Sequence, residues 1–211
     1  MEKNFFKEIL IILLASIILS ISYIYPSLES NEFFLKLFGM FILVLGVNII
    51  TKKIVARTLD INIETKWWSV YYYGFLEKKH FNKPLPMIFL PIVLSIFSGG
   101  FLQWFPILEF EEKARVERVA KRYELYRFSS VTEWHSGLIA FFGLFSNLVL
   151  FFIFLFFNQI ELGKISLFYS IWLLLPFSRL DGSKILFGSR KLWVFSCVLI
   201  LVSLIVFSLS F

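Results

Sequence analysis

Six long apolar runs constrain this chain more than any other feature of its sequence. They cover Ile9–Tyr25, Phe33–Ile50, Pro86–Leu108, Gly137–Phe157, Ile165–Leu180 and Leu192–Phe211. A helix needs about 20 apolar residues to cross a bilayer core roughly 30 Å thick, so most of these runs are long enough. With 58% hydrophobic residues and a mean hydropathy of +0.79, the chain lies outside the composition of soluble globular domains. The runs therefore predict a multi-pass cell-membrane protein in which residues 1–211 form a single membrane domain.

The distribution of basic residues predicts how the runs are oriented. The formal net charge is +6, but the basic residues gather beside apolar runs, where they face anionic lipid. We therefore expect the lipid bilayer, and not nucleic acid, to be the partner of this charge. If Pro86–Leu108 enters and leaves on one side, all 21 Lys and Arg residues except Lys36 and Lys164 fall on a single side. If all six runs cross, the basic residues divide almost evenly, so the positive-inside rule favours the first arrangement, with the N-terminus cytoplasmic and the C-terminus outside.

The run Pro86–Leu108 is also unusual for a straight spanning helix. Pro91 and Pro106 remove helix hydrogen bonds, and the pair Gly99-Gly100 near its middle permits a tight reversal. Irregular backbone at membrane depth is tolerated where protein or a wet cavity covers it. We therefore expect an all-α fold of about five transmembrane helices plus a re-entrant hairpin. A proline-kinked sixth transmembrane helix is the alternative.

Two segments between the second and third expected spans carry their own patterns. Phe110–Phe128 predicts a surface helix, because oppositely charged residues such as Glu111 and Arg115 stand four apart. Trp67–Tyr73 is typical of a strand or of an aromatic belt at headgroup depth. We favour the belt.

A carboxylate follows the fifth run in a recognisable pattern. Pro176, Leu180, Asp181 and Gly182 stand in the spacing P-x-x-x-L-D-G. A carboxylate at the edge of hydrocarbon usually has a partner and marks a functional site. The pattern resembles the N-x-x-P-x-x-x-L-D-G motif of the site-2 proteases, a family of intramembrane zinc metalloproteases, with Leu173 in place of the usual Asn. The resemblance implies that Asp181 stands where the family has a zinc ligand.

Two further stretches extend the resemblance. Gly143-Leu-Phe-Ser-Asn147 resembles the family's G-P-x-x-N helix, with Leu144 in place of proline. Lys53-Ile-Val-Ala-Arg57 resembles the segment that follows the zinc-binding H-E-x-x-H. Together with the string that starts at Asp181, which resembles a small archaeal-type branch, the resemblance covers about residues 35–195.

The catalytic residues that the resemblance implies are not present at their expected places. Alignment puts Asn48, Ile49 and Lys52 at the positions of the first His, the Glu and the second His of H-E-x-x-H. Two histidines one helical turn apart bind zinc in that motif, and the Glu activates water. The two histidines of the chain, His80 and His135, lie outside the apolar runs. We therefore expect no catalytic residue, no metal and no cofactor.

The positions Asn48, Ile49, Lys52, Asn147 and Asp181 then form a degenerate site. Since Lys52 stands in place of a zinc-binding His, we expect its ammonium to replace the metal and to pair with Asp181. The alternative is that Lys52 extends to the headgroups while Asp181 caps a local turn. We expect Asn147 to cap or bridge backbone near the Asp181 segment, because an amide in hydrocarbon requires partners.

Two classes of function fit these residues. The first is a catalytically inactive, site-2 protease-like membrane protein that binds or regulates a membrane partner, such as a transmembrane helix of another protein. The second is a divergent active intramembrane metalloprotease, which would require zinc. A small transporter is disfavoured, because few ionisable residues lie within the apolar runs.

Overall fold

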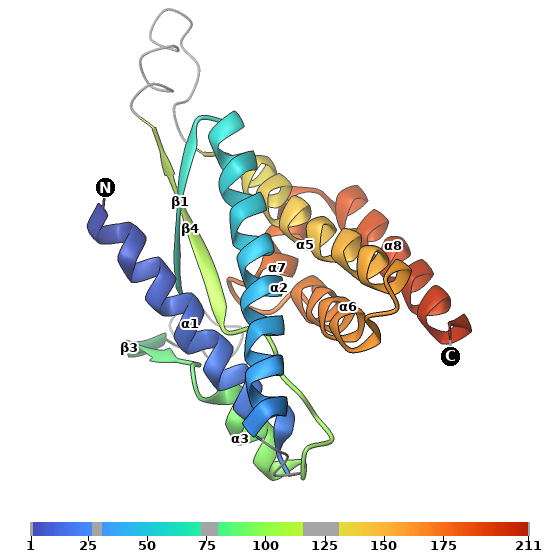
Figure 1. Cartoon of the computed structure of the whole chain (residues 1–211). Helices are drawn as coiled ribbons and strands as arrows, with labels where there is room; N and C mark the ends of the chain where they lie inside the picture. Colours follow the sequence, from blue (N-terminus) through green and yellow to red (C-terminus); the bar gives the residue numbers. More distant parts are fainter. Residues whose placement is uncertain (1, 27–30, 73–79, 116–130, 211) are drawn as a thin grey trace, which may run out of the picture.

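The computed structural model describes residues 2–26, 31–72, 80–115 and 131–210. These ranges contain helices α1 (Glu2–Ile24), α2 (Asn31–Thr58), α3 (Leu90–Phe97), α5 (Glu133–Phe156), α6 (Ile160–Leu174), α7 (Asp181–Gly188) and α8 (Arg190–Leu209), and strands β1 (Ile61–Trp67), β2 (Ser69–Tyr72), β3 (His80–Pro86) and β4 (Leu108–Ala114) (Figure 1).

Four helices of the described residues are long and apolar enough to cross a membrane. They are α1 from Phe6 onward, α2, α5 and α8. The chain therefore has the make-up of a helical membrane protein, as its sequence predicts. The fifth apolar run forms the shorter helix α6 of 15 residues, about 22 Å long at 1.5 Å per residue. The segment that follows α6 is not helical and leads to Asp181.

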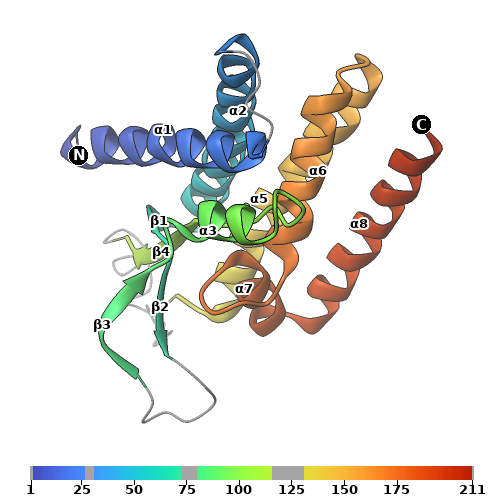
Figure 2. The ribbon, with the colours of Figure 1, turned by 90° about the horizontal axis from the view of Figure 1, so that it is seen from below.

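The helices pack around α5. Helices α1 and α2 lie side by side, and α5 contacts α2, α6, α7 and α8 (Figures 1 and 2). Large side chains from the facing helices, including Phe41 and Leu45 of α2 and Leu144 and Phe151 of α5, are fully buried in one continuous core. This core fixes the ends of α2, α5 and α7 relative to one another.

The expectation of an all-α fold is wrong, because the segment between α2 and α5 contains strands. Strand β4 pairs antiparallel with β1, with Trp67 opposite Leu108 and Ile61 opposite Ala114. The expected surface helix Phe110–Phe128 is therefore wrong at its start, and residues 116–130 lie outside the described part of the chain.

The charges that favour a local helix are used across the strand pair instead. Lys66 of β1 contacts Glu111 at 2.5 Å, and Lys113 of β4 contacts Glu64 at 2.8 Å. Cross-strand pairs of opposite charge stabilise a sheet as i,i+4 pairs stabilise a helix. In addition, Ile61 and Ile63 alternate with more exposed residues along β1 and bury one face of the strand. The non-local pairing and this burial decide between two locally compatible structures.

Trp68 lies at an interruption in a long β-hairpin. Its N–H donates to Ile107 C=O (2.9 Å), and its C=O accepts from Met87 N–H (3.0 Å). Strand β3 pairs with β2 beyond this point, while β4 pairs with β1 before it. Residues 87–107 thus leave the hairpin and return to it at one residue. Trp67 and β2 form the strand that is one of the two expectations for Trp67–Tyr73, while Tyr73 lies outside the described residues. The aromatic belt stays a prediction.

The excursion of residues 87–107 contains only a short helix. Helix α3 has 8 residues, about 12 Å, and ends in a turn where Gly99 and Gly100 adopt φ of 62° and 86°. Residues 86–108 therefore do not form one continuous helix, and the number of membrane crossings stays a prediction. Ser22 of α1 donates to Pro91 C=O (2.9 Å) and accepts at its own C=O from Ser95 Oγ (2.7 Å), so α3 is fastened to the C-terminal end of α1.

Candidate functional site

The predicted ion pair between Lys52 and Asp181 is present. Lys52 Nζ lies 2.5 Å from Asp181 Oδ2, although the two residues are 129 positions apart in the chain. Lys52 is 6% exposed and Asp181 is 1% exposed. The alternative in which Lys52 extends to the headgroups and Asp181 caps a turn is therefore wrong.

Gly143 of α5, which has no side chain, leaves space for the Lys52 side chain to reach Asp181. A Cβ atom added to Gly143 would lie 2.4 Å from Lys52 Cε and 2.8 Å from Lys52 Cγ. Real carbon atoms do not approach so closely, so the aliphatic stem of Lys52 occupies the space that glycine leaves open. The sequence placed Gly143 in a family-like pattern, but its contact with Lys52 depends on how α2 and α5 pack.

The loop between α6 and α7 places Asp181 at the start of α7. A Cβ atom on Gly182 would lie 2.2 Å from Leu174 C=O and 2.4 Å from Leu175 C=O, so only glycine lets the end of α6 pass against the start of α7. Ser183 Oγ donates to the C=O of Leu180 and Ser178, both at 2.6 Å. The glycine of the L-D-G pattern thus permits close packing of α7 against the end of α6, and the carboxylate of Asp181 points to the interior.

The remaining positions of the degenerate site on α2 also face the interior. Asn48, one turn before Lys52, is 1% exposed, and Ile49 is 6% exposed. Asn48 Nδ2 makes no hydrogen bond with the described residues. Positions 48 and 52 therefore lie on the buried face that meets Asp181. An amide, an ammonium and one carboxylate do not fit zinc, which takes thiolate, imidazole and carboxylate ligands.

The expectation for Asn147 is wrong. Its side chain is fully buried, but neither Oδ1 nor Nδ2 makes a hydrogen bond within the described part of the chain. Its backbone C=O instead accepts from Ser166 Oγ of α6 (2.7 Å). Gly143 is the residue of α5 beside Lys52, and Asn147 lies one turn deeper, about 6 Å along the axis.

The two histidines lie on different elements. His80 begins β3, and His135 lies in the first turn of α5, where its Nδ1 contacts Thr132 Oγ1. Over residues 2–26, 31–72, 80–115 and 131–210, no group of three or more His, Cys, Asp or Glu side chains is placed to hold a metal ion.

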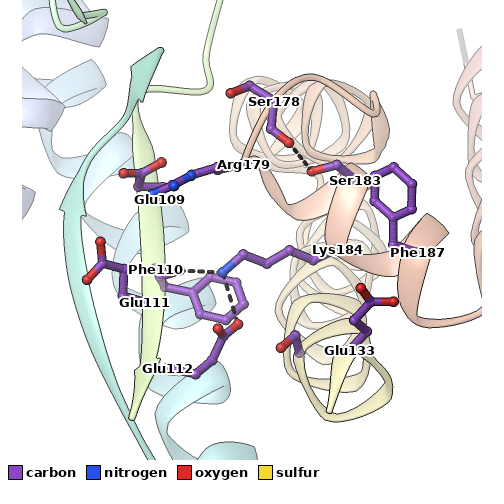
Figure 3. Close-up of a pocket in the computed structure, with 11 residues that line it drawn as sticks. Glu109, Phe110, Glu111, Glu112, Glu133, Ser178, Arg179, Ser183, Lys184 and Phe187 are labelled. Carbon is purple, nitrogen blue, oxygen red and sulfur yellow. Dashed lines mark hydrogen bonds and ion pairs between the residues drawn. The ribbon is translucent and has the colours of Figure 1, made fainter. Parts of the chain in front are cut away.

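A cavity of about 420 Å³ lies between β4 and α7, and the ring centroid of its lining residue Phe110 is 5.0 Å from Lys52 Nζ of the ion pair. Its lining includes Glu109, Phe110, Glu111 and Glu112 from β4, Glu133 and Ser136 from the start of α5, and Ser178, Arg179, Ser183, Lys184 and Phe187 from α7 and the loop before it (Figure 3). The strand wall and the start of α5 are acidic, and the α7 wall is basic.

The edge of β4 that faces this cavity has no partner strand among the described elements. Phe110 lies opposite Thr65, and the N–H and C=O groups of each residue point away from the other strand. Thr65 N–H donates to Glu8 of α1 (3.1 Å), whereas Phe110 C=O accepts from the Lys184 ammonium. The Lys184 ammonium also lies 3.0 Å from Glu112 Oε1 and 3.4 Å from the centroid of the Phe110 ring (Figure 3). Lys184 thus covers an exposed strand edge with a cation.

Glu109 is the buried carboxylate of the cavity. It is 4% exposed, and its Oε2 accepts no hydrogen bond from any described residue. Burial raises the pKa of this carboxyl above its ordinary value, and the nearby charges of Arg179 and Lys184 oppose that shift. The Arg179 guanidinium lies 4.1 Å from the centroid of the Tyr71 ring. The sequence does not single out Glu109, Phe110 or Lys184, because their roles depend on β4 being a strand.

The site combines a fixed buried ion pair with an adjacent cavity that has an open strand edge. Comparison with protein-family models, with curated proteins and with solved structures gave no match to this chain.

Proposed function

We propose that this chain is a catalytically inactive, site-2 protease-like membrane protein that binds an extended segment of a membrane partner. The observation that carries the proposal is the buried contact of 2.5 Å between Lys52 and Asp181. The resemblance puts zinc between these two positions, and here an ammonium supplies the positive charge. A buried carboxylate requires a compensating charge, so Lys52 keeps the site stable without a metal.

Binding without cleavage is supported by the free edge of β4. An extended peptide can add to such an edge through main-chain hydrogen bonds. The backbone groups of Glu112 point the same way as those of Phe110, because the two residues are two apart on one strand. Lys184 is the described side chain that bonds to this edge, through Phe110 C=O, and a partner strand would displace it.

We also propose five membrane crossings with the N-terminus cytoplasmic. The excursion of residues 87–107 would then enter and leave on one side. This topology is supported by the hydrogen bonds of Met87 and Ile107 to the same residue, Trp68, and by the basic residues on either side of the run. Helix α6, with the extended segment up to Leu180, would complete the fourth crossing.

Zinc content tests the functional proposal. The protein purified in detergent is expected to hold far less than one zinc per chain by mass spectrometry of metals. The variant N48H/I49E/K52H is expected to bind about one zinc per chain, because two histidines at i and i+4 would face Asp181. Adding Asp181→Asn should remove most of that zinc.

The matched control is V47H/T51H, which has the same spacing on a face turned by about 100°. This control is expected to bind no zinc beyond the background of the purified protein. One zinc per wild-type chain, removable by a chelator together with proteolytic activity, would establish the divergent active protease instead.

Single-cysteine labelling tests the topology in a Cys197→Ser background. A cysteine in place of Lys113, whose side chain is 58% exposed, is expected to react from the cytoplasmic side. A cysteine in place of the exposed Gln159, between α5 and α6, is expected to react from the outside. Reaction of the Lys113→Cys protein from the outside, with the N-terminus cytoplasmic, would mean that residues 87–107 cross the membrane.

A further inference from the structure

We propose that the segment bound in the cavity between β4 and α7 is basic, with Lys or Arg side chains that meet Glu109 and Glu112. This inference rests on the proposed function, because it specifies the chemistry of the partner that adds to β4. It assigns specificity to the acidic residues of the strand wall.

The protein itself shows how this wall receives a cation. The Lys184 ammonium is held by three groups of β4: Phe110 C=O, the Glu112 carboxylate at 3.0 Å and the face of the Phe110 ring at 3.4 Å. Carbonyl oxygen, carboxylate and aromatic face each stabilise an ammonium in proteins. Lys184 therefore marks the position that a partner's cation would take.

Insertion of a partner strand would create a need for new positive charge. Lys184 reaches β4 from α7 across the cavity (Figure 3). A strand that pairs with β4 would separate this cation from the wall and leave Glu112 without it. The Oε2 atom of the buried Glu109 makes no hydrogen bond with any described residue. No existing hydrogen bond at this atom would therefore compensate for the removal of the Lys184 cation. A basic segment replaces the lost cation, whereas an acidic segment adds like charge.

The net charge of the lining favours the same partner. Four glutamates and two cations line the cavity, and Glu111 is already paired with Lys66, so Glu109, Glu112 and Glu133 remain against Arg179 and Lys184. In the proposed topology this cavity opens on the cytoplasmic side, where the segments that flank membrane spans are rich in Lys and Arg. The partner is therefore a basic juxtamembrane segment of another membrane protein.

Synthetic peptides test the inference on the full-length protein in phosphatidylcholine nanodiscs. The probe is an octapeptide in which Lys-Lys-Val-Val occurs twice (the Lys–Val peptide), because Glu109 and Glu112 are three apart on β4 and project from opposite faces. It is compared with the same peptide carrying Glu in place of Lys (the Glu–Val peptide), and with the Lys–Val peptide N-methylated at every residue. The Lys–Val peptide is expected to bind at least about tenfold more tightly than either comparison peptide. Glu109→Gln should weaken its binding about tenfold, and Glu112→Gln should weaken it as well, whereas Glu32→Gln at the exposed start of α2 should leave it unchanged.

The outcomes separate this inference from the proposed function. Equal binding of the Glu–Val and Lys–Val peptides would overturn the charge specificity and leave strand addition intact. Equal binding of the N-methylated peptide would overturn strand addition and leave the charge specificity intact. Binding that requires phosphatidylglycerol in the nanodisc and ignores both Glu→Gln changes would assign the peptide to the lipid surface and overturn the inference. Thermal unfolding of each variant shows whether it is folded. If the Glu109→Gln protein is not folded, the comparison of the three peptides on the wild-type protein decides whether the site prefers a basic segment.

Discussion

Replacing Asp181 by Asn, or Lys52 by Met, is expected to destabilise the protein by about 3 kcal/mol in each case, because either change leaves one buried charge without its partner. The two residues are 1% and 6% exposed, so solvent cannot compensate the remaining charge. The double variant Lys52→Met, Asp181→Asn leaves no orphan charge. Its cost is expected to be smaller than the sum of the single costs by about 2 kcal/mol.

A double-mutant cycle measured by unfolding in detergent gives this coupling free energy. The control cycle uses Lys66 and Glu111, which lie at the same distance of 2.5 Å but have side chains 46% and 36% exposed. An exposed pair of this kind is expected to couple by about 0.5 kcal/mol. Equal, small couplings in both cycles would show that the Lys52–Asp181 contact does not stabilise the site.

Replacing Gly143 by Ala is expected to cost almost as much as removing Lys52. The new Cβ would lie 2.4 Å from Lys52 Cε, so either Lys52 leaves Asp181 or α5 moves away from α2. The loss of about 3 kcal/mol from the broken pair would exceed the gain of about 0.5–1 kcal/mol that Ala brings to a helix interior. The free energy of unfolding in detergent measures the difference.

A background without the ion pair separates the two effects of this substitution. In the variant Lys52→Ala, Asp181→Asn, the stem of Lys52 is absent, and Gly143→Ala should become neutral or stabilising. The matched control is Gly46→Ala in α2, where an added Cβ meets no atom within 4 Å and should stabilise the protein slightly. If Gly143→Ala destabilises the protein as much without Lys52 as with it, the glycine is not required to make room for the Lys52 side chain.

Part of the site could be predicted because it depends on short local sequence patterns. The P-x-x-x-L-D-G pattern and the position of Lys52 before Lys53-Ile-Val-Ala-Arg57 led to the ion pair with Asp181. A buried carboxylate needs a nearby cation, and Lys52 was the cation at the aligned position. The contacts of Gly143 and Gly182 could not be predicted, because they record how closely α5 and α7 approach other elements.

The sequence by itself determined which segments are apolar enough to cross the membrane, because the length and hydropathy of α1, α2, α5 and α8 are local properties. It also determined that residues 86–108 do not form one straight helix, since Gly99 and Gly100 sit in the middle of that run. Only the tertiary structure decided that Leu108–Ala114 is a strand and that residues 87–107 begin and end at Trp68. It also decided that the side chain of Asn147 makes no hydrogen bond within the described residues. These features depend on pairing and burial between distant segments, and strand formation follows such context more than the intrinsic preference of its residues.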